Sequence, residues 1–310
     1  MIKMACVGDN VVDINYVDGM INPGGNCANA AVYAKQLGHD TSYIGVLADD
    51  PYAKVLTDSF DKIGVKYDRC VTLHGETGRC TCKLIDGDRV LGDENDGGLV
   101  KSNPLVITDE LVNYLKGFDI VHTSCYSYLD DQLYKFKDAG IPVVYDFSTV
   151  WTDERLAKVC PNVKFVLFSD REGSGVEANL KMLDDATNKY NCELAIMTMG
   201  KKGACVYDGK NLFEKEPYNI EAGARDTTGC GDSWISAFIS TYVECYKRLS
   251  ILEAMSDEQL ILEKNKEDFR KYVLEISMCM GNLKSRHTTL VKGGYGYGVP
   301  IAEFNKNAGR

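Results

Sequence analysis

Residues 226–232 read Asp-Thr-Thr-Gly-Cys-Gly-Asp, and an apolar run, Ser233 to Phe238, follows them directly. Glycine adopts backbone angles that other residues resist, and Asp is favoured near a helix start, so this pattern predicts a tight turn that opens into a helix. The first N–H groups of a helix have no partner within it and attract an anion. A carboxylate would repel a phosphate that it merely helped to bind, so we predict that Asp232 takes a proton from an attacking hydroxyl. The N–H groups predicted to stabilise the phosphoryl group in transfer are those of Gly229, Cys230 and Gly231.

A second glycine pair opens another helical pattern early in the chain. Residues 24–31 read Gly-Gly-Asn-Cys-Ala-Asn-Ala-Ala, and apolar residues recur at helical spacing as far as Leu37. Asn26 suits the N-cap position of this helix. Asn26 and Asn29 also lie one turn apart, where their amides would bind substrate hydroxyls while Gly24 and Gly25 let the substrate approach the backbone. Both interpretations of Asn26 can hold together.

These two segments resemble the two signatures of the PfkB (ribokinase-like) carbohydrate kinases, in the family's order and roughly two hundred residues apart. The resemblance spans essentially the whole chain and implies an ATP-dependent sugar kinase. It also implies an α/β fold, a ribokinase-like three-layer sandwich with a mainly parallel central sheet. Residues 1–310 would form a single kinase domain, with a small β-lid contributed by about residues 13–24 and 75–93.

The resemblance also implies how the sugar is bound. Two carboxylates, Asp9 and Asp13, follow the first apolar strand, and on the residues alone they are equally well read as solvated loop residues. Family members use an acid here to hold sugar hydroxyls; Asp13 is the closer match and Asp9 the weaker one. Arg79 lies on a strand of a predicted hairpin that would rise over the sugar. It would meet an anionic part of the substrate, although exposed strand arginines usually face solvent.

The nucleotide and metal sites are likewise implied by resemblance. Thr198, Gly200 and Gly203 match a Thr-x-Gly-x-x-Gly turn that borders ATP, and Asn282 is an adenine-side candidate. Residues 169–172 stand where the family carries Asn-x-x-Glu, with Ser169 in place of Asn, and Glu172 is the Mg²⁺ candidate. Asp226 either braces its turn or helps to hold a monovalent cation such as K⁺. The cofactors expected are ATP, Mg²⁺ and a monovalent cation.

The second half of the chain alternates short apolar strands with helix-compatible stretches. This pattern predicts a parallel sheet covered on both faces, with ligands at the carboxyl ends of its strands. The run from Ser233 to Val243 is apolar nearly all round, as in a buried central helix. The charged stretch 256–271 favours a surface helix. Residues 293–298, Gly-Gly-Tyr-Gly-Tyr-Gly, follow no strand–helix unit, so we interpret them as a loop.

Composition excludes several other classes of protein. A net charge of −10 argues against nucleic acid as the main partner. The chain has no apolar run of eighteen residues and no signal peptide pattern, which predicts a soluble, cytosolic protein. Its twelve cysteines are scattered, which favours reduced, buried thiols, and no ligand pair near Cys80 and Cys82 completes a metal site. There is no P-loop motif, and the four histidines form no hydrolytic triad pattern.

The substrate is inferred from three short stretches. The short link between Asp13 and Gly24, the start Gly8 to Asp13 and the stretch Tyr145 to Trp151 resemble fructoselysine 6-kinases. These enzymes phosphorylate the 6-hydroxyl of a fructose unit attached to an amino acid. The alternatives are a fructokinase, a ribokinase, a 2-keto-3-deoxygluconate kinase, or an inactive sugar- or nucleotide-binding sensor on the same fold. Dimerisation through the lid strands is a further expectation from the family.

Overall fold

The central sheet has eight strands. The computed structural model describes residues 1–309 except 86–87, 171–172, 219–222 and 256–265. The strands lie in the order β14-β13-β12-β11-β10-β9-β1-β4, and all neighbours from β4 to β12 are parallel, whereas β13 and β14 are antiparallel. Their bounds are β1 Lys3–Val7, β4 Asp40–Ile44, β9 Ile120–Ser124, β10 Val143–Asp146, β11 Phe165–Ser169, β12 Leu194–Thr198, β13 Ala204–Tyr207 and β14 Leu212–Lys215.

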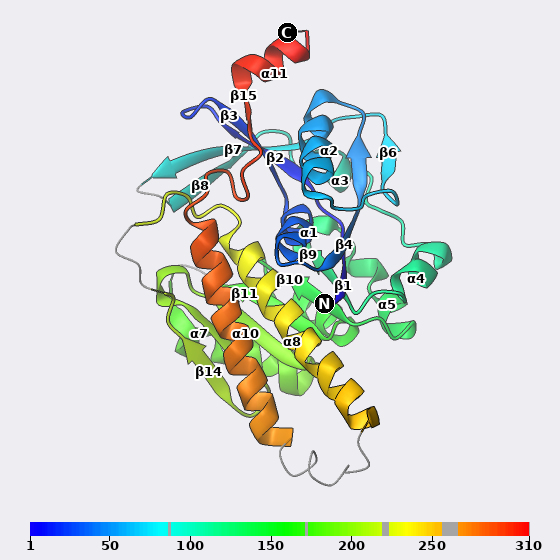
Figure 1. Cartoon of the computed structure of the whole chain (residues 1–310), viewed down its shortest axis with the longest axis vertical. Helices are drawn as coiled ribbons and strands as arrows, with labels where there is room; N and C mark the ends of the chain where they lie inside the picture. Colours follow the sequence, from blue (N-terminus) through cyan, green and yellow to red (C-terminus); the bar gives the residue numbers. More distant parts are fainter. Residues whose placement is uncertain (86–87, 171–172, 219–222, 256–265, 310) are drawn as a thin grey trace.

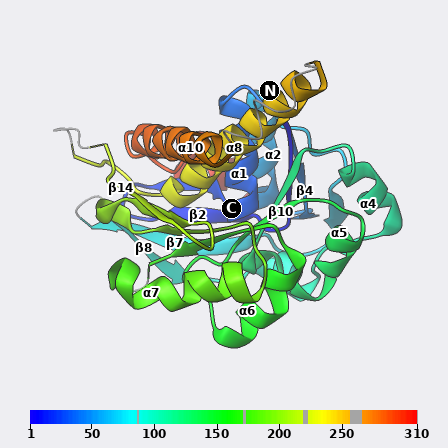
Figure 2. The same ribbon diagram turned by 90° about the horizontal axis from the view of Figure 1, so that it is seen from below.

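Helices cover both faces of this sheet, as the apolar strands require. Figure 2 shows α1, α2, α8 and α10 on one side of the sheet and α6 and α7 on the other. Met4 and Cys6 of β1 pack into one hydrophobic core, and the alternating Ala5 and Val7 pack into the second. The predicted three-layer arrangement is therefore confirmed. The helices are α1 Asn26–Gln36, α2 Pro51–Ile63, α3 Gly98–Ser102, α4 Asp109–Leu115, α5 Tyr134–Asp138, α6 Asp153–Val159, α7 Gly175–Asp184, α8 Cys230–Met255, α10 Lys266–Thr288 and α11 Ile301–Asn307.

A second, smaller sheet contains the segments that were expected to form a lid, and we refer to this sheet as the lid. Its five strands lie in the order β15-β3-β2-β7-β8, and Figure 1 shows them together at one end of the main sheet. β15 was not expected, because this two-residue strand comes from the far C-terminal end of the chain. A further sheet has two strands, β5 and β6. The bounds are β2 Val11–Asn15, β3 Met20–Gly24, β5 Val46–Ala48, β6 Val71–Leu73, β7 Gly78–Ile85, β8 Asp88–Asp93 and β15 Val299–Pro300.

Some elements differ from the sequence-based expectation. The buried central helix α8 extends well beyond the expected 233–243, because it continues as one side of a long helical pair with α10 (Figure 1). Most of the expected surface helix 256–271 lies outside the residues that the structure describes, and α10 begins within its last part, at Lys266. Residues 86–87, the turn of the hairpin predicted around Arg79, also lie outside them.

Two expectations from composition can be compared with the structure. Each cysteine whose side chain the structure describes is a free thiol, as the scattered cysteine positions predicted. In the described segments we find no helix that combines the length and the apolar character of a bilayer span.

Candidate active site

The predicted turn opens into a helix as expected. Gly229 has φ 72°, and an added Cβ would lie 2.3 Å from the hydroxyl of Tyr33, so only glycine fits. The N–H of Ser233 donates to the carbonyl of Gly229 at 2.9 Å, which starts α8 directly after the turn. A Cβ placed on Gly231 would meet no heavy atom within 4 Å. The start of α8 therefore faces open space at Gly231, as an anion site requires.

Asp232 lies in the first turn of α8 and is 8% exposed. Its Oδ2 accepts a hydrogen bond from the side-chain amide of Asn29 at 2.7 Å. Asn29 comes from α1 and is itself buried. A buried donor of this kind fixes the orientation of the carboxylate that we assign to proton transfer.

Asp226 braces the turn from within. Its Oδ1 accepts from the N–H of Thr228 at 2.8 Å, and its Oδ2 accepts from the N–H of Gly293 at 2.7 Å. Of the two roles expected for Asp226, the structure therefore contains the bracing one. The second bond ties the turn to a distant loop near the C-terminus.

The start of α1 departs from the sequence-based expectation. Gly25 occupies the N-cap position, so Asn26 is the first helical residue and not the cap. The cap is supplied by Asp9, whose carboxylate accepts from the N–H of Asn26 at 2.6 Å and of Cys27 at 3.3 Å. An added Cβ on Gly25 would lie 2.6 Å from Cα of Asn10, so close packing of the protein itself accounts for this glycine.

The expected sugar contact of Asp9 is not retained. Besides the two helix N–H groups, Oδ1 accepts from the hydroxyls of Ser124 at 2.7 Å and of Ser127 at 3.1 Å. The side chain is 3% exposed. A carboxylate with four internal donors holds the framework of the site rather than a ligand.

A second carboxylate, Asp146, lies beside the start of α1. Its Oδ2 accepts from the amide of Asn26 at 3.0 Å, and its Oδ1 accepts from the N–H of Ser148 at 2.6 Å. Burial raises the pKa of Asp146 to about 7, although these two hydrogen bonds oppose the rise. Asn26 and Asn29 thus each hold a carboxylate, one helical turn apart. Our sequence analysis assigned Asp146 no role; the signal available was an acid at the end of an apolar strand.

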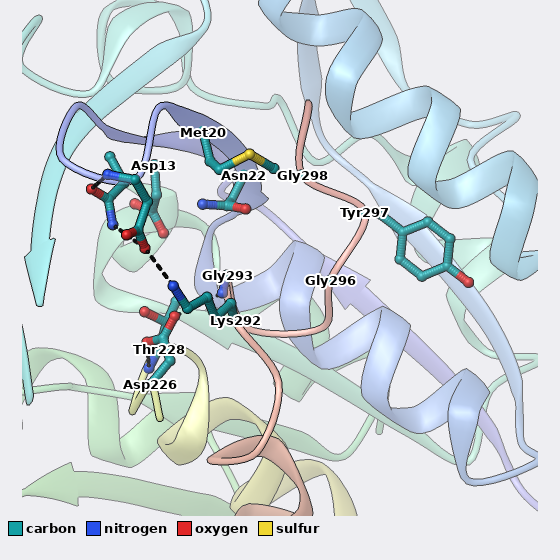
Figure 3. A pocket seen from close by; sticks show the side chains of 12 residues that line it. Asp13, Met20, Asn22, Asp226, Thr228, Lys292, Gly293, Gly296, Tyr297 and Gly298 are labelled. Carbon is teal, nitrogen blue, oxygen red and sulfur yellow. Dashed lines mark hydrogen bonds and ion pairs between the residues drawn. The ribbon is translucent and has the colours of Figure 1, made fainter. Parts of the chain in front are cut away.

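A cavity of ≈ 440 Å³ lies between the lid, the turn and the C-terminal loop (Figure 3). Asp13 lines it from β2, and Asn22 lies directly opposite Asp13 on β3. Asp13 is 2% exposed, which places its carboxylate at the buried side of the cavity. The complete lining is Asp13, Asn15, Asp18, Met20, Asn22, Asp226, Thr228, Lys292, Gly293, Gly296, Tyr297 and Gly298.

The glycine-rich segment 293–298 forms one wall of this cavity. It is a loop, as interpreted from the sequence. Its part in the site was missed, because glycine alternating with tyrosine carries no recognised signal for a binding wall. A Cβ added at Gly293 or at Gly298 would lie 2.2 Å from Oδ1 of Asn22. The loop thus packs closely against the side chain of Asn22 on β3 at both positions.

Arg79 does not lie on the cavity side of the lid. In the parallel pair β2–β7, Arg79 is opposite Val12 and Cys80 is opposite Asp13, so Arg79 and Asp13 point to opposite faces. The guanidinium lies 5.1 Å from the ring centre of Tyr52, and it pairs with Glu76 at 3.3 Å and with Glu94 at 3.5 Å. Arg79 therefore joins the lid to α2, and the expected contact with an anionic substrate is not retained.

The nucleotide-side residues divide into two groups. Thr198 ends β12 and Gly200 has open space around it, so a ligand can approach both. A Cβ added at Gly203 would lie 2.1 Å from the carbonyl oxygen of Lys215, so contact with β14 accounts for this glycine. A contact of this turn with ATP stays a prediction.

Both ends of the Asn282 amide are hydrogen-bonded within the protein. Its Oδ1 accepts from the indole N–H of Trp234 at 2.8 Å, and its Nδ2 donates to the carbonyl of Glu216 at 2.7 Å. The side chain is 4% exposed. It joins α10 to α8 and to the segment after β14, so we do not retain it as an adenine contact.

Glu172 lies outside the residues that the structure describes. Among the described residues, no group of three or more His, Cys, Asp or Glu side chains is arranged to hold an ion. A Mg²⁺ ion that relies mainly on nucleotide phosphates and water needs no such group.

Comparison with known proteins identifies the family. The model of the pfkB family carbohydrate kinases matches residues 9–259. The fructosamine kinase FrlD of Bacillus subtilis is 36% identical over 247 residues, covering 79% of this chain and 84% of that protein. The fructoselysine 6-kinase of Escherichia coli is 28% identical over 239 residues, covering 77% and 88%. The structure of a ribokinase from Giardia lamblia superimposes with a TM-score of 0.75 at 14% identity, covering 100% and 99%. The chain therefore belongs to the pfkB family of carbohydrate kinases and is an ATP-dependent sugar phosphotransferase.

Proposed function

We propose that this enzyme transfers the γ-phosphoryl group of ATP to the 6-hydroxyl of a fructosamine, a fructose unit whose C1 carries an amine. Fructoselysine is the substrate expected from the sequence. The observation that carries the proposal is the 36% identity to a fructosamine kinase over most of both chains. The alternatives, fructokinase, ribokinase and 2-keto-3-deoxygluconate kinase, share the chemistry and differ in the sugar.

Asp232 is proposed as the general base. A sugar alcohol is a weak acid and a poor nucleophile, so its proton moves late, as the new O–P bond forms. The amide of Asn29 holds Oδ2 of Asp232 at 2.7 Å and so fixes the direction in which the carboxylate accepts that proton. The start of α8, which faces open space at Gly231, adds the positive end of a long helix dipole where negative charge develops on the phosphoryl group.

The sugar is proposed to lie between the lid and the catalytic turn. Asp13 and Asn22 face each other across β2 and β3 and line the cavity. Their carboxylate and amide suit sugar hydroxyls, which both donate and accept. The backbone at Gly24 is part of the same surface, because a Cβ there would lie 3.0 Å from Oδ2 of Asp13. Asn26, at the start of α1, is the remaining residue that we propose to bind the sugar.

The two ions remain part of the proposal. Mg²⁺, when bound, neutralises negative charge on the transferred phosphoryl group, and Glu172 is proposed to lie near it. A monovalent cation is proposed near Asp226, where the turn meets the C-terminal loop. A homodimer formed through the lid and a cytosolic location also stay predictions.

The test is ATP consumption by the purified protein with fructoselysine, fructose, ribose and 2-keto-3-deoxygluconate. Preferred turnover of fructoselysine, with the phosphate on O6 by NMR, is the expected result. Preference for a plain sugar would agree with the kinase activity but reject a fructosamine as the substrate. No turnover of any of these sugars would reject all four as acceptors and favour another amino-acid-linked sugar.

A further inference from the structure

Opposite charges meet at the edge of the cavity. Nζ of Lys292, on the C-terminal loop, lies 3.2 Å from Oδ2 of Asp18, in the turn between β2 and β3. Both residues line the cavity that Asp13 enters from its buried side. The amide of Asn15 donates to Asp18 at 3.2 Å, and Oδ1 of Asn15 accepts from the N–H of Asp18 at 2.9 Å. The anion is thus fixed by its turn, whereas the cation is carried on a long side chain.

The ion pair of Lys292 and Asp18 can be replaced by ion pairs with a ligand at small cost in free energy. The side chain of Lys292 is 65% exposed and that of Asp18 is 32% exposed. An exposed ion pair adds little to stability, because water and salt screen it and because it restricts two side chains. A ligand with one positive and one negative group can therefore replace each partner at small cost. The pair presents adjacent binding groups for such a ligand.

The spacing suits one particular kind of ligand. The ammonium and carboxylate of an α-amino acid are attached to the same carbon, so they need an anion and a cation that are close neighbours. A plain sugar carries neither charge, and an acid sugar carries only the carboxylate. A fructose unit attached to a free amino acid carries both charges and the hydroxyls that Asp13 would bind.

We propose that Lys292 and Asp18 select the amino-acid part of the substrate, Lys292 by binding its carboxylate and Asp18 by binding its ammonium. This inference rests on the proposed fructosamine kinase activity and narrows its substrate class to adducts of free amino acids. Adducts whose carboxylate is blocked, as within a peptide, lose the contact with Lys292.

The experiment compares fructoselysine with its α-carboxamide, which lacks only the negative charge. The measured quantity is the ratio of kcat/KM for the acid to kcat/KM for the amide. Lys292→Gln is expected to lower this ratio roughly ten- to hundredfold, the range of a lost charge-assisted hydrogen bond. Lys292→Glu is expected to lower it further, because it places a like charge beside the carboxylate.

The matched control is Lys247→Gln. Lys247 also pairs with an aspartate, Asp119, at 2.8 Å, but Asp119 directly precedes β9 and so lies at the opposite end of the sheet. This variant should keep the wild-type ratio.

Three results would overturn the inference. One is an unchanged ratio in Lys292→Gln, with wild-type protein active on fructoselysine. Another is an equal loss on acid and amide together with a lower melting temperature, which would make the pair a structural link between loop and hairpin. The third is a wild-type protein that phosphorylates no fructosamine, which would reject the proposed function as well and is thereby distinguished from the other two.

Discussion

Two glycine-rich segments of this chain differ in what their glycines do. In the turn 226–232, Gly229 takes a left-handed conformation and the chain enters α8 at once, with open space at Gly231. In the loop 293–298, the glycines let the backbone approach Asn22, and the chain then enters the short strand β15. The two segments cannot be distinguished by their number of glycines. They differ because only the first leads into a long helix, and the start of a helix attracts an anion.

The two segments meet at one carboxylate. Asp226 accepts one hydrogen bond from the turn and one from the loop. A single side chain thus joins the turn to the cavity wall through two hydrogen bonds. The role of each segment can be tested by substitutions in the turn, in the loop and at Asp226, which links them.

The largest effect is expected from Asp232→Asn in the turn. Loss of a general base should lower kcat by roughly 10²–10⁴-fold while ATP still binds, because the amide keeps the shape of the carboxylate. Steady-state kinetics and calorimetric titration with ATP would measure the two quantities. Asp153→Asn is a matched control, since Asp153 also lies in the first turn of a helix but on the opposite face of the sheet. Retained turnover in Asp232→Asn would remove Asp232 from the chemistry.

The turn was predictable because its signal is local. Glycine, a small residue, glycine and an acid precede an apolar run, and each feature acts within a few residues. The main sheet was predictable for the same reason, since apolar strands alternate with helical stretches. The placement of Asn26 and Asn29 one helical turn apart was also predictable, because it follows from the spacing of residues in a helix.

The loop and the lid contacts were not predictable, because they depend on pairing between distant segments. Arg79 faces away from Asp13 only because β2 and β7 pair in a particular register. Asp9 caps α1 across seventeen residues of chain. Lys292 and Asp18 are separated by 274 residues, and no local pattern indicates that they meet.

Gly229→Ala tests the shape of the turn. The left-handed backbone would cost about 1–2 kcal/mol, and overpacking against Tyr33 would add about 1–3 kcal/mol, in the free energy of unfolding. Gly231→Ala, with open space around its Cβ, should cost less than half as much. Urea unfolding of both variants measures the difference. Equal losses would show that the contact with Tyr33 does not limit residue 229.

Asp226→Asn tests the link between the two segments. The amide offers one oxygen for two N–H donors, so one of Thr228 and Gly293 loses its acceptor. A buried donor left without a partner costs about 1–3 kcal/mol, and the melting temperature should fall accordingly. Activity should fall as well, because the turn and the cavity wall are no longer held together. A wild-type melting temperature would mean that water or a neighbouring group replaces the lost acceptor.

Gly298→Ala tests the cavity wall and should have the smallest effect. The added methyl group would lie 2.2 Å from Oδ1 of Asn22, whose flexible side chain can move away. Stability should therefore change by less than about 0.5 kcal/mol, while KM for the sugar rises a few-fold because Asn22 leaves its place opposite Asp13. In the background of Asn22→Ala, which has already lost that amide, Gly298→Ala should have no further effect on KM. If the two substitutions instead add independently, Asn22 and the loop act on the sugar separately, and closure of the loop against β3 is not what shapes the cavity.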